Sequence, residues 1–193
     1  MRWRKLESDV RLCSLPEMTR HLDYMSALSS IANLVHGVRV YSLNSCIEKI
    51  MLHVRSGRKE LGGLLMGRVY QGNLNGDTPA EALTVITGAL PSTKFNNSTV
   101  SLEMGAEVWC QVPDPAEAGE VVVGWYHSHP DLGAFFSSTD RKTQRAFFNN
   151  HYSLGLVVDP YRDELRVYCG ADSKEYKYKI IVFDAGLEIA QDQ

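Results

Sequence analysis

The chain has 193 residues, a formal net charge of −3, 44 % hydrophobic residues and 22 % charged residues. This size and composition are typical of one soluble, globular domain with a sizeable core. The slightly acidic balance argues against a general nucleic-acid binder, whose phosphate contacts require a basic surface, although Arg2, Arg4 and Lys5 stand near the start.

Hydrophobic runs and cysteine spacing exclude two further classes. No apolar run approaches the roughly 20 residues that cross a bilayer, and charges interrupt the first twenty residues, unlike a signal peptide. We therefore expect a cytoplasmic protein without membrane contact. The cysteines show no C-x-x-C spacing, so we expect reduced thiols rather than a disulfide framework or a zinc knuckle; they are Cys13, Cys46, Cys110 and Cys169.

An N-terminal arm, residues 1–37, precedes the body. Ser14, with Pro16 in the first turn and Glu17 three residues after the serine, predicts a helix start, and Gly37 predicts its end. Apolar residues follow at helical spacing: Met18, Leu22, Met25, Leu28, Ala32 and Val35. This helix either covers the core of the body or docks a partner or a second copy.

Residues 38–183 are expected to form one α/β (α+β) body, and residues 184–193 a loose tail. The patterns predict helices at 43–55, with Ser42 as cap, 102–111 and 139–149. They predict a polar loop at 91–99. Strands are predicted at 38–41, 62–71, 83–90, 121–126, 154–158, 165–168 and 176–183.

Two histidines follow the predicted central strand 121–126. In an extended chain, residues two apart project from the same face, so His127 and His129 direct their imidazoles toward one point. Pro130 favours extended dihedrals for His129. The pair therefore forms half of a metal site, whereas a lone histidine would be interpreted as packed or solvated.

A carboxylate completes this candidate site. Asp140 lies at the start of the predicted helix 139–149, three residues after Ser137. Helix capping explains this spacing by itself, because a serine cap and an acid in the first turn are an ordinary pattern. Together with the histidines, Asp140 gives two imidazoles and one carboxylate, which leave a fourth position for water as in catalytic zinc sites.

Glu60 is the candidate general base. It precedes the glycine-rich strand 62–71, and a solvated turn residue is the alternative interpretation. Spacing alone does not distinguish it from Glu48 or Glu103.

These residues together resemble a known family. His127-Ser128-His129-Pro130, then six residues, Ser137, two residues and Asp140 resemble the signature of the JAMM/MPN+ (JAB1/MPN/Mov34) metalloproteases. Glu60, followed by Gly63 and Gly67, is similar to the upstream glutamate motif of that family. The likeness extends over residues 38–183, and every functional position of the motif is filled.

The resemblance implies a curved, mixed β-sheet between helices, of the cytidine-deaminase-like type. It implies one catalytic Zn²⁺ held at the positions of His127, His129 and Asp140. The residue matching Glu60 takes a proton from water and returns it to the leaving amine, and the one matching Ser137 stabilises the oxyanion. Ser128 is expected to face away from the metal.

The resemblance also implies an isopeptidase that cleaves after the C-terminal tail of a ubiquitin-like protein. Residues 91–100 match a family insertion that contacts the tail, so the candidate contacts are Asn96, Asn97, Ser98 and Thr99; an ordinary polar connection is the alternative. The short segment 149–153 favours a prokaryotic member, acting with E1-like or E2-like proteins of a bacterial or archaeal conjugation system, including antiphage systems.

Three alternatives stay open from the sequence. A peptidase that processes a sulfur-carrier protein would use the same site. An iron oxygenase with two histidines and one carboxylate would leave Glu60 without a role. A non-catalytic assembly module would not need the filled ligand set.

Overall fold

A computed structural model describes residues 39–72, 81–97, 102–114 and 119–184. The predicted helix of the arm and the predicted tail from residue 185 lie outside these residues, so the division into arm, body and tail stays a prediction. No helix in the described ranges is long and apolar enough to cross a membrane. Cys46 is buried, Cys169 half-buried and Cys110 exposed, and all three are free thiols.

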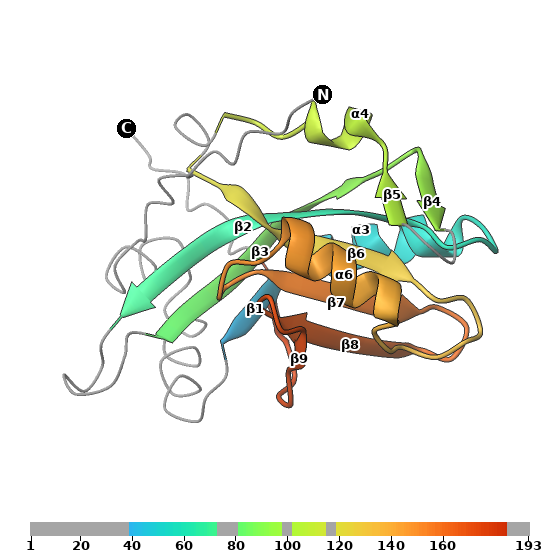
Figure 1. The fold of residues 1–193 in the computed structure, drawn as a ribbon. Helices are drawn as coiled ribbons and strands as arrows, with labels where there is room; N and C mark the ends of the chain where they lie inside the picture. The colour runs from blue at the N-terminus through green and yellow to red at the C-terminus, as the bar shows by residue number, and fades with distance from the viewer. Residues whose placement is uncertain (1–38, 73–80, 98–101, 115–118, 185–193) are drawn as a thin grey trace, which may run out of the picture.

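One curved sheet of eight strands organises the described chain (Figure 1), with the order β10-β1-β3-β2-β6-β7-β8-β9. Pairing is parallel for β10 with β1, β1 with β3 and β6 with β7, and antiparallel elsewhere, so the sheet is mixed. The strands are β1 (Val40–Leu43), β2 (Gly62–Gly72), β3 (Glu81–Pro91), β6 (Val121–Ser128), β7 (Leu154–Asp159), β8 (Glu164–Cys169), β9 (Lys174–Glu175) and β10 (Ile181–Phe183).

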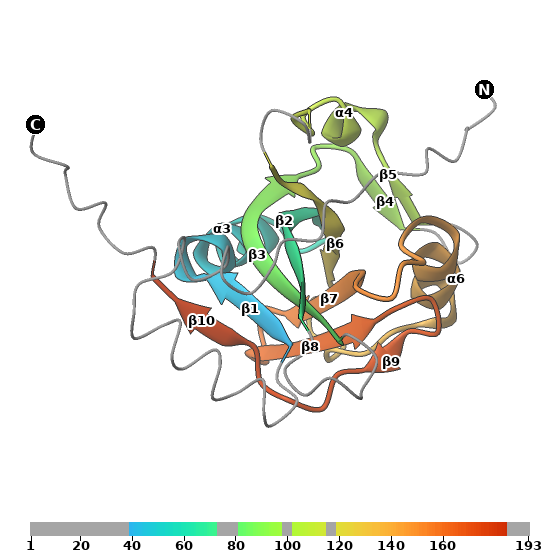
Figure 2. The same ribbon diagram turned by 90° about the vertical axis from the view of Figure 1, so that its left-hand side faces the viewer.

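Two helices cover opposite faces of this sheet (Figure 2): α3 (Asn44–Arg55) and α6 (Ser138–Phe147). On the α3 face, Cys46, Ile50 and Val54 pack against strand residues such as Tyr126 and Leu156. The α6 face has a second cluster that contains Leu64, Val108, Trp125, Phe136, Phe148, Val157 and Tyr168. Because successive strand residues alternate between faces, Trp125 and Tyr126 belong to different clusters. The predicted mixed sheet between helices is confirmed.

The prediction for residues 91–111 was wrong in part. The predicted loop 91–99 contains the last residue of β3 and a short strand, β4 (Phe95–Asn97). The predicted helix 102–111 begins as β5 (Leu102–Met104), which pairs with β4, and only α4 (Ala106–Trp109) is helical. The helical pattern of the sequence did not reveal that a partner strand lies a few residues earlier.

Two smaller predictions were also wrong. Ser42 does not cap α3, because β1 extends to Leu43 and Ser42 is buried inside that strand. The predicted strand 176–183 is a strand only at Ile181–Phe183. Residues 176–180 connect β9, at one edge of the sheet, with β10 at the other edge, so they do not extend either strand.

Gly155, on β7, is required by a close approach of side chains. A Cβ atom at this position would lie 2.2 Å from Phe136 Cζ and 2.9 Å from Gln144 Oε1. We expect Gly155→Ala to lower the free energy of unfolding by about 1–3 kcal/mol, because overpacking displaces the ring. Thermal unfolding measures the change, with Gly57→Ala as control, since the nearest atom to a Cβ there is 3.8 Å away. Equal stability of the two variants would contradict this assignment.

Candidate metal centre and active site

The end of β6 brings the two histidines together. His127 is the seventh residue of β6 and pairs with Val157 of β7, and the backbone N–H of His129 donates to Val158 O at 2.9 Å, which continues the extended path. Their Nε2 atoms are 3.2 Å apart. Both rings are buried. Two neighbouring strands therefore orient the pair, as the two-residue spacing predicts.

The two carboxylate oxygens of Asp140 have different surroundings. Oδ2 accepts a hydrogen bond from the Ser137 backbone N–H at 2.6 Å, and Ser137 Oγ accepts from the Asp140 N–H at 3.2 Å, which is a capping box. Oδ1 lies 3.4 Å from His127 Nε2. Capping and ligation, which the sequence leaves as alternatives, are therefore compatible in this carboxylate.

The three side chains fit a tetrahedral metal ion. Ligand atoms at about 2.0–2.1 Å from Zn²⁺ lie about 3.3 Å from one another. The separations of His127 Nε2 from His129 Nε2 and from Asp140 Oδ1 are 3.2 and 3.4 Å, and one ligand atom from each of the three residues lies within 4.8 Å of the others. Among the described residues, buried Asp140 Oδ1 has no hydrogen-bond donor. A cation at the centre of the three groups would satisfy this oxygen.

Electrostatics favours the ligating protonation states. Burial and the neighbouring His127 lower the pKa of His129, against the opposing effects of Asp140 and Glu60. Burial raises the pKa of Asp140, but the interaction with the nearby His127 and the hydrogen bonds with Ser137 outweigh it and lower the pKa to about 2. At neutral pH, His129 is neutral and Asp140 is ionised, which are the forms that bind metals.

Glu60 lies beside this cluster and is partly exposed. Its Oε1 atom is 3.9 Å from His129 Nε2, and its side chain is 21 % exposed. The next residue, Leu61, is tied to Ser128: its N–H donates to Ser128 Oγ at 3.0 Å, and the Ser128 N–H donates to Leu61 O at 2.8 Å. Ser128 therefore points away from the cluster, as expected, and joins the segment of Glu60 to the strand of the histidines.

Aromatic packing around His127 was not predicted. The Trp125 ring stacks on the His127 imidazole, with centroids 4.5 Å apart and planes at 9°, and Phe136 contacts it from another side. Trp125 Nε1 donates to Gln144 Oε1 of α6 at 2.7 Å. The two-residue period of β6 could have placed Trp125 beside His127, whereas Gln144 depends on the packing of α6.

A buried acid, Asp159, holds the loop between the histidines and α6. Its carboxylate accepts from the backbone N–H groups of Asp131 at 3.1 Å and Gly133 at 2.7 Å, and from those of Tyr161 and Arg162. This role of Asp159 was not predicted from the sequence. Its partners in the loop lie 26 or more residues earlier in the sequence, so residue spacing alone does not predict these contacts.

The structure places the predicted tail contacts only in part. The backbone of Asn96 and Asn97 lies in β4, and Ser98 and Thr99 lie outside the described residues. Their role in binding stays a prediction. β5 lies against α6, the helix whose first turn contains Asp140, so the hairpin β4–β5 lies on the same side of the sheet as the candidate metal site.

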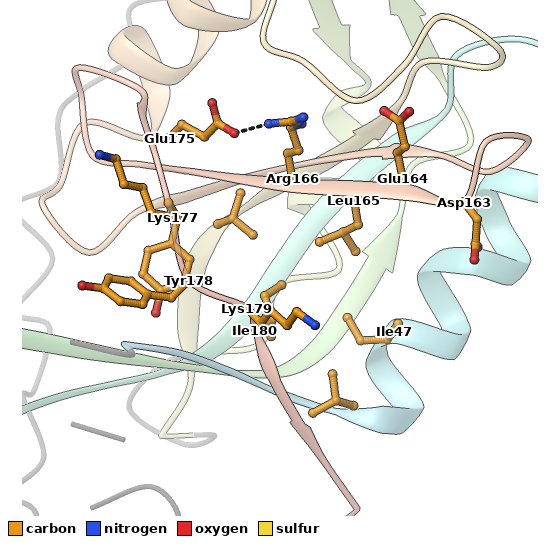
Figure 3. A pocket seen from close by; sticks show the side chains of 13 residues that line it. Ile47, Asp163, Glu164, Leu165, Arg166, Glu175, Lys177, Tyr178, Lys179 and Ile180 are labelled. Carbon is orange, nitrogen blue, oxygen red and sulfur yellow. Dashed lines mark hydrogen bonds and ion pairs between the residues drawn. The ribbon is translucent and has the colours of Figure 1, made fainter. Parts of the chain in front are cut away.

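A pocket of about 590 Å³ lies elsewhere, between α3, β8 and the segment 176–182 (Figure 3). Ile47, Leu165 and Tyr178 line it, together with Arg166 and Glu175, which form an ion pair. It contains none of the candidate site residues.

The mixed sheet between helices, with a cluster of two histidines and one aspartate that could hold a metal ion, has the features of a domain of the JAB/MPN class. A family model described as "Prokaryotic homologs of the JAB domain" matches residues 44–168. The chain belongs to this family, and the resemblance predicted from the motif is confirmed.

Curated relatives support this assignment. The chain is 34 % identical to COP9 signalosome complex subunit 5 of Dictyostelium discoideum over 122 residues, which are 59 % of this chain and 33 % of that protein. It is 29 % identical to ubiquitin carboxyl-terminal hydrolase RPN11 of Saccharomyces cerevisiae over 123 residues, 63 % of this chain and 38 % of that protein. The matches therefore span little more than a third of these relatives.

A solution structure of a protein from Desulfitobacterium hafniense has the same fold. It aligns with a TM-score of 0.54 at 22 % identity and covers 79 % of this chain and 98 % of that one.

Proposed function

We propose that this protein is a zinc-dependent isopeptidase that cleaves after the C-terminal tail of a ubiquitin-like protein. The observation that supports it most is the convergence of His127, His129 and Asp140, with Glu60 beside them. A structural zinc site would use a fourth protein ligand, whereas three ligands and an adjacent carboxylate suit hydrolysis. His127, His129 and Asp140 would hold the ion.

A bound Zn²⁺ lowers the pKa of water to about 7 and polarises the scissile carbonyl. Glu60 takes the proton from the attacking water at its carboxylate and returns it to the amine of the leaving lysine. The partial exposure of its side chain gives water and substrate access to this oxygen. The cysteines have no part, because no covalent intermediate is needed.

Ser137 supplies a hydrogen bond to the developing oxyanion. Its Oγ atom accepts from the Asp140 N–H, which leaves the hydroxyl proton available for donation toward the substrate. A donor of this kind contributes roughly 3 kcal/mol to the stabilisation of a transition state. The capping box therefore also sets the direction of the Ser137 hydroxyl.

The hairpin β4–β5 is the proposed binding site for the C-terminal tail of the ubiquitin-like protein. Within the described residues, β4 pairs only with β5, so each strand has an edge that can accept an extended chain by β-augmentation. Asn96, Asn97, Ser98 and Thr99 are the proposed contacts. The partner system is a bacterial or archaeal ubiquitin-like conjugation pathway with E1-like and E2-like proteins, including pathways of antiphage defence.

The test uses ubiquitin and a panel of prokaryotic ubiquitin-like and sulfur-carrier proteins. Each is linked through its C-terminal carboxyl either to a lysine ε-amine or to a linear peptide extension. We expect zinc-loaded protein to cleave the lysine-linked form, chelator to remove the activity, and added zinc to restore it. Preferential cleavage of linear extensions would instead identify a precursor-processing peptidase, and no cleavage of any substrate by the zinc-loaded protein would refute the proposal.

A further inference from the structure

One carboxylate closes the base of the hairpin β4–β5. The residues before β4 and after β5 meet where the Gly105 N–H donates to Lys94 O at 2.8 Å. Glu107 Oε1 accepts from Ser92 Oγ at 2.9 Å, from the Lys94 N–H at 2.9 Å and from Thr93 Oγ1 at 3.3 Å. We call this arrangement of Glu107 with residues 92–94 the Glu107 clamp.

The Glu107 clamp is connected to the candidate active site through Ser92. Ser92 is buried, and its backbone N–H donates to Gly62 O at 2.9 Å. Gly62 lies two residues after Glu60 and pairs with His127 across β2 and β6. One residue, Ser92, therefore contacts both the carboxylate at the hairpin base and the strand that follows the candidate base.

The other side of the clamp is anchored in the core. Val108, the neighbour of Glu107 on α4, is buried in the cluster that contains Trp125. The next residue, Trp109, stacks on Phe148 with ring centroids 6.1 Å apart and planes at 18°. Glu107 thus projects from a segment that is packed against the α6 face, while the hairpin extends beyond it.

Glu107 holds its partners as a charged acceptor. Burial raises its pKa, but hydrogen bonds from its own backbone N–H and from Ser92, Lys94 and Thr93 outweigh burial and lower the pKa. Hydrogen bonds to an ionised acceptor are roughly twice as strong as those between neutral groups. Three residues at the base of the hairpin therefore donate hydrogen bonds to one oxygen of an ionised carboxylate.

We infer that Glu107 is a positioning residue that fixes the hairpin β4–β5 beside the metal-binding cluster and thereby sets the affinity for an extended C-terminal tail. This inference rests on the proposed function. A tail that pairs with a preformed strand edge loses less free energy to ordering than one that must first fix a loose hairpin. Glu107 does not touch the reacting atoms, so its effect falls on KM rather than on kcat.

Gly105 provides an independent way to open the clamp. Its backbone angles, φ −59° and ψ 148°, are accessible to alanine, yet a Cβ atom there would lie 1.8 Å from Glu107 Oε2. Gly105→Ala therefore displaces the carboxylate without removing it. The three atoms nearest to such a Cβ all belong to the Glu107 carboxyl group, so the same glycine substitution should have little further effect once Glu107→Ala has removed that group.

The experiment compares zinc-loaded wild type, E107Q, E107A, G105A and the G105A/E107A double variant. We expect the Lys94 and Gly105 amides to exchange hydrogen about ten- to a hundred-fold faster in E107A and G105A, as loss of a charged hydrogen bond predicts. On ubiquitin linked to a lysine ε-amine, KM should rise about tenfold, while kcat stays within about threefold. E107Q should lie between wild type and E107A, and the double variant should equal E107A.

E48A is the matched control, because Glu48 is exposed on α3 and bonds only Asn44 in the described structure. It should leave exchange and KM unchanged. Unchanged exchange in E107A, or additive effects in the double variant, would overturn the clamp. Faster exchange with an unchanged KM would overturn the role in substrate affinity. If wild type cleaves nothing, the proposed function and that role fall together, while exchange, which needs no substrate, still decides the clamp.

Discussion

Glu60→Gln is expected to lower kcat by about 10²–10⁴-fold while the protein keeps its zinc. Glutamine has nearly the same shape but does not accept a proton at neutral pH. Glu60 is not one of the three clustered ligand groups, and its Oε1 atom is 3.9 Å from the nearest histidine nitrogen, so the metal-binding cluster stays complete. Steady-state cleavage of the lysine-linked substrate and zinc content, measured on the same preparation, check both statements.

Glu48→Gln is the control for this experiment, because it makes the same chemical change on an exposed surface of α3. It should cleave as wild type does. Cleavage by Glu60→Gln at the wild-type rate would show that another group moves the proton. Loss of zinc in this variant would assign Glu60 to metal binding instead.

Asp140→Ala is expected to remove both the metal and part of the stability of α6. Loss of Oδ1 removes a ligand, so zinc should no longer bind stoichiometrically and cleavage should disappear. Loss of Oδ2 removes the acceptor for the Ser137 N–H. The lost cap lowers the free energy of unfolding by about 0.5–2 kcal/mol, even in chelator.

Thermal unfolding with zinc and with chelator separates these two losses. Wild type should be stabilised by zinc, because a ligand that binds only the folded state raises its stability. Asp140→Ala and His127→Ala should both lose this zinc-dependent stabilisation. Asp163→Ala, at an exposed turn, is the control and should keep it. Full zinc content in Asp140→Ala would contradict its assignment as a ligand.

The positions of the candidate metal ligands were largely predictable because local rules decide them. A strand period of two and the proline after His129 sufficed to predict that the histidine rings converge. Asp140 was predictable from capping chemistry, but the placement of one oxygen at the helix cap and the other beside His127 depends on the tertiary structure. Glu60 depended on the family motif, because its place is fixed by Ser128, which lies 67 residues away from Leu61.

The parts that the sequence did not predict depend on distant partners. The short strands β4 and β5 exist because they pair with each other, and residues 102–104 alone resemble the start of a helix. Alternation in residues 176–183 suggested one strand, but this segment connects opposite edges of the sheet. The role of Glu107 was not predicted, since this residue fell within the predicted helix 102–111 and its partners at 92–94 fell within the predicted polar loop 91–99.

The helix cap at Asp140, combined with its proposed role as a metal ligand, constrains how such a domain can lose the proposed activity during evolution. A substitution at Glu60 removes a proton acceptor and leaves the start of α6 intact. A substitution at Asp140 also removes the hydrogen bond from the Ser137 N–H that stabilises the first turn of that helix. A protein that loses Asp140 therefore needs a compensating helix cap. Inactive descendants of this chain should therefore accumulate changes at Glu60 earlier than changes at Asp140.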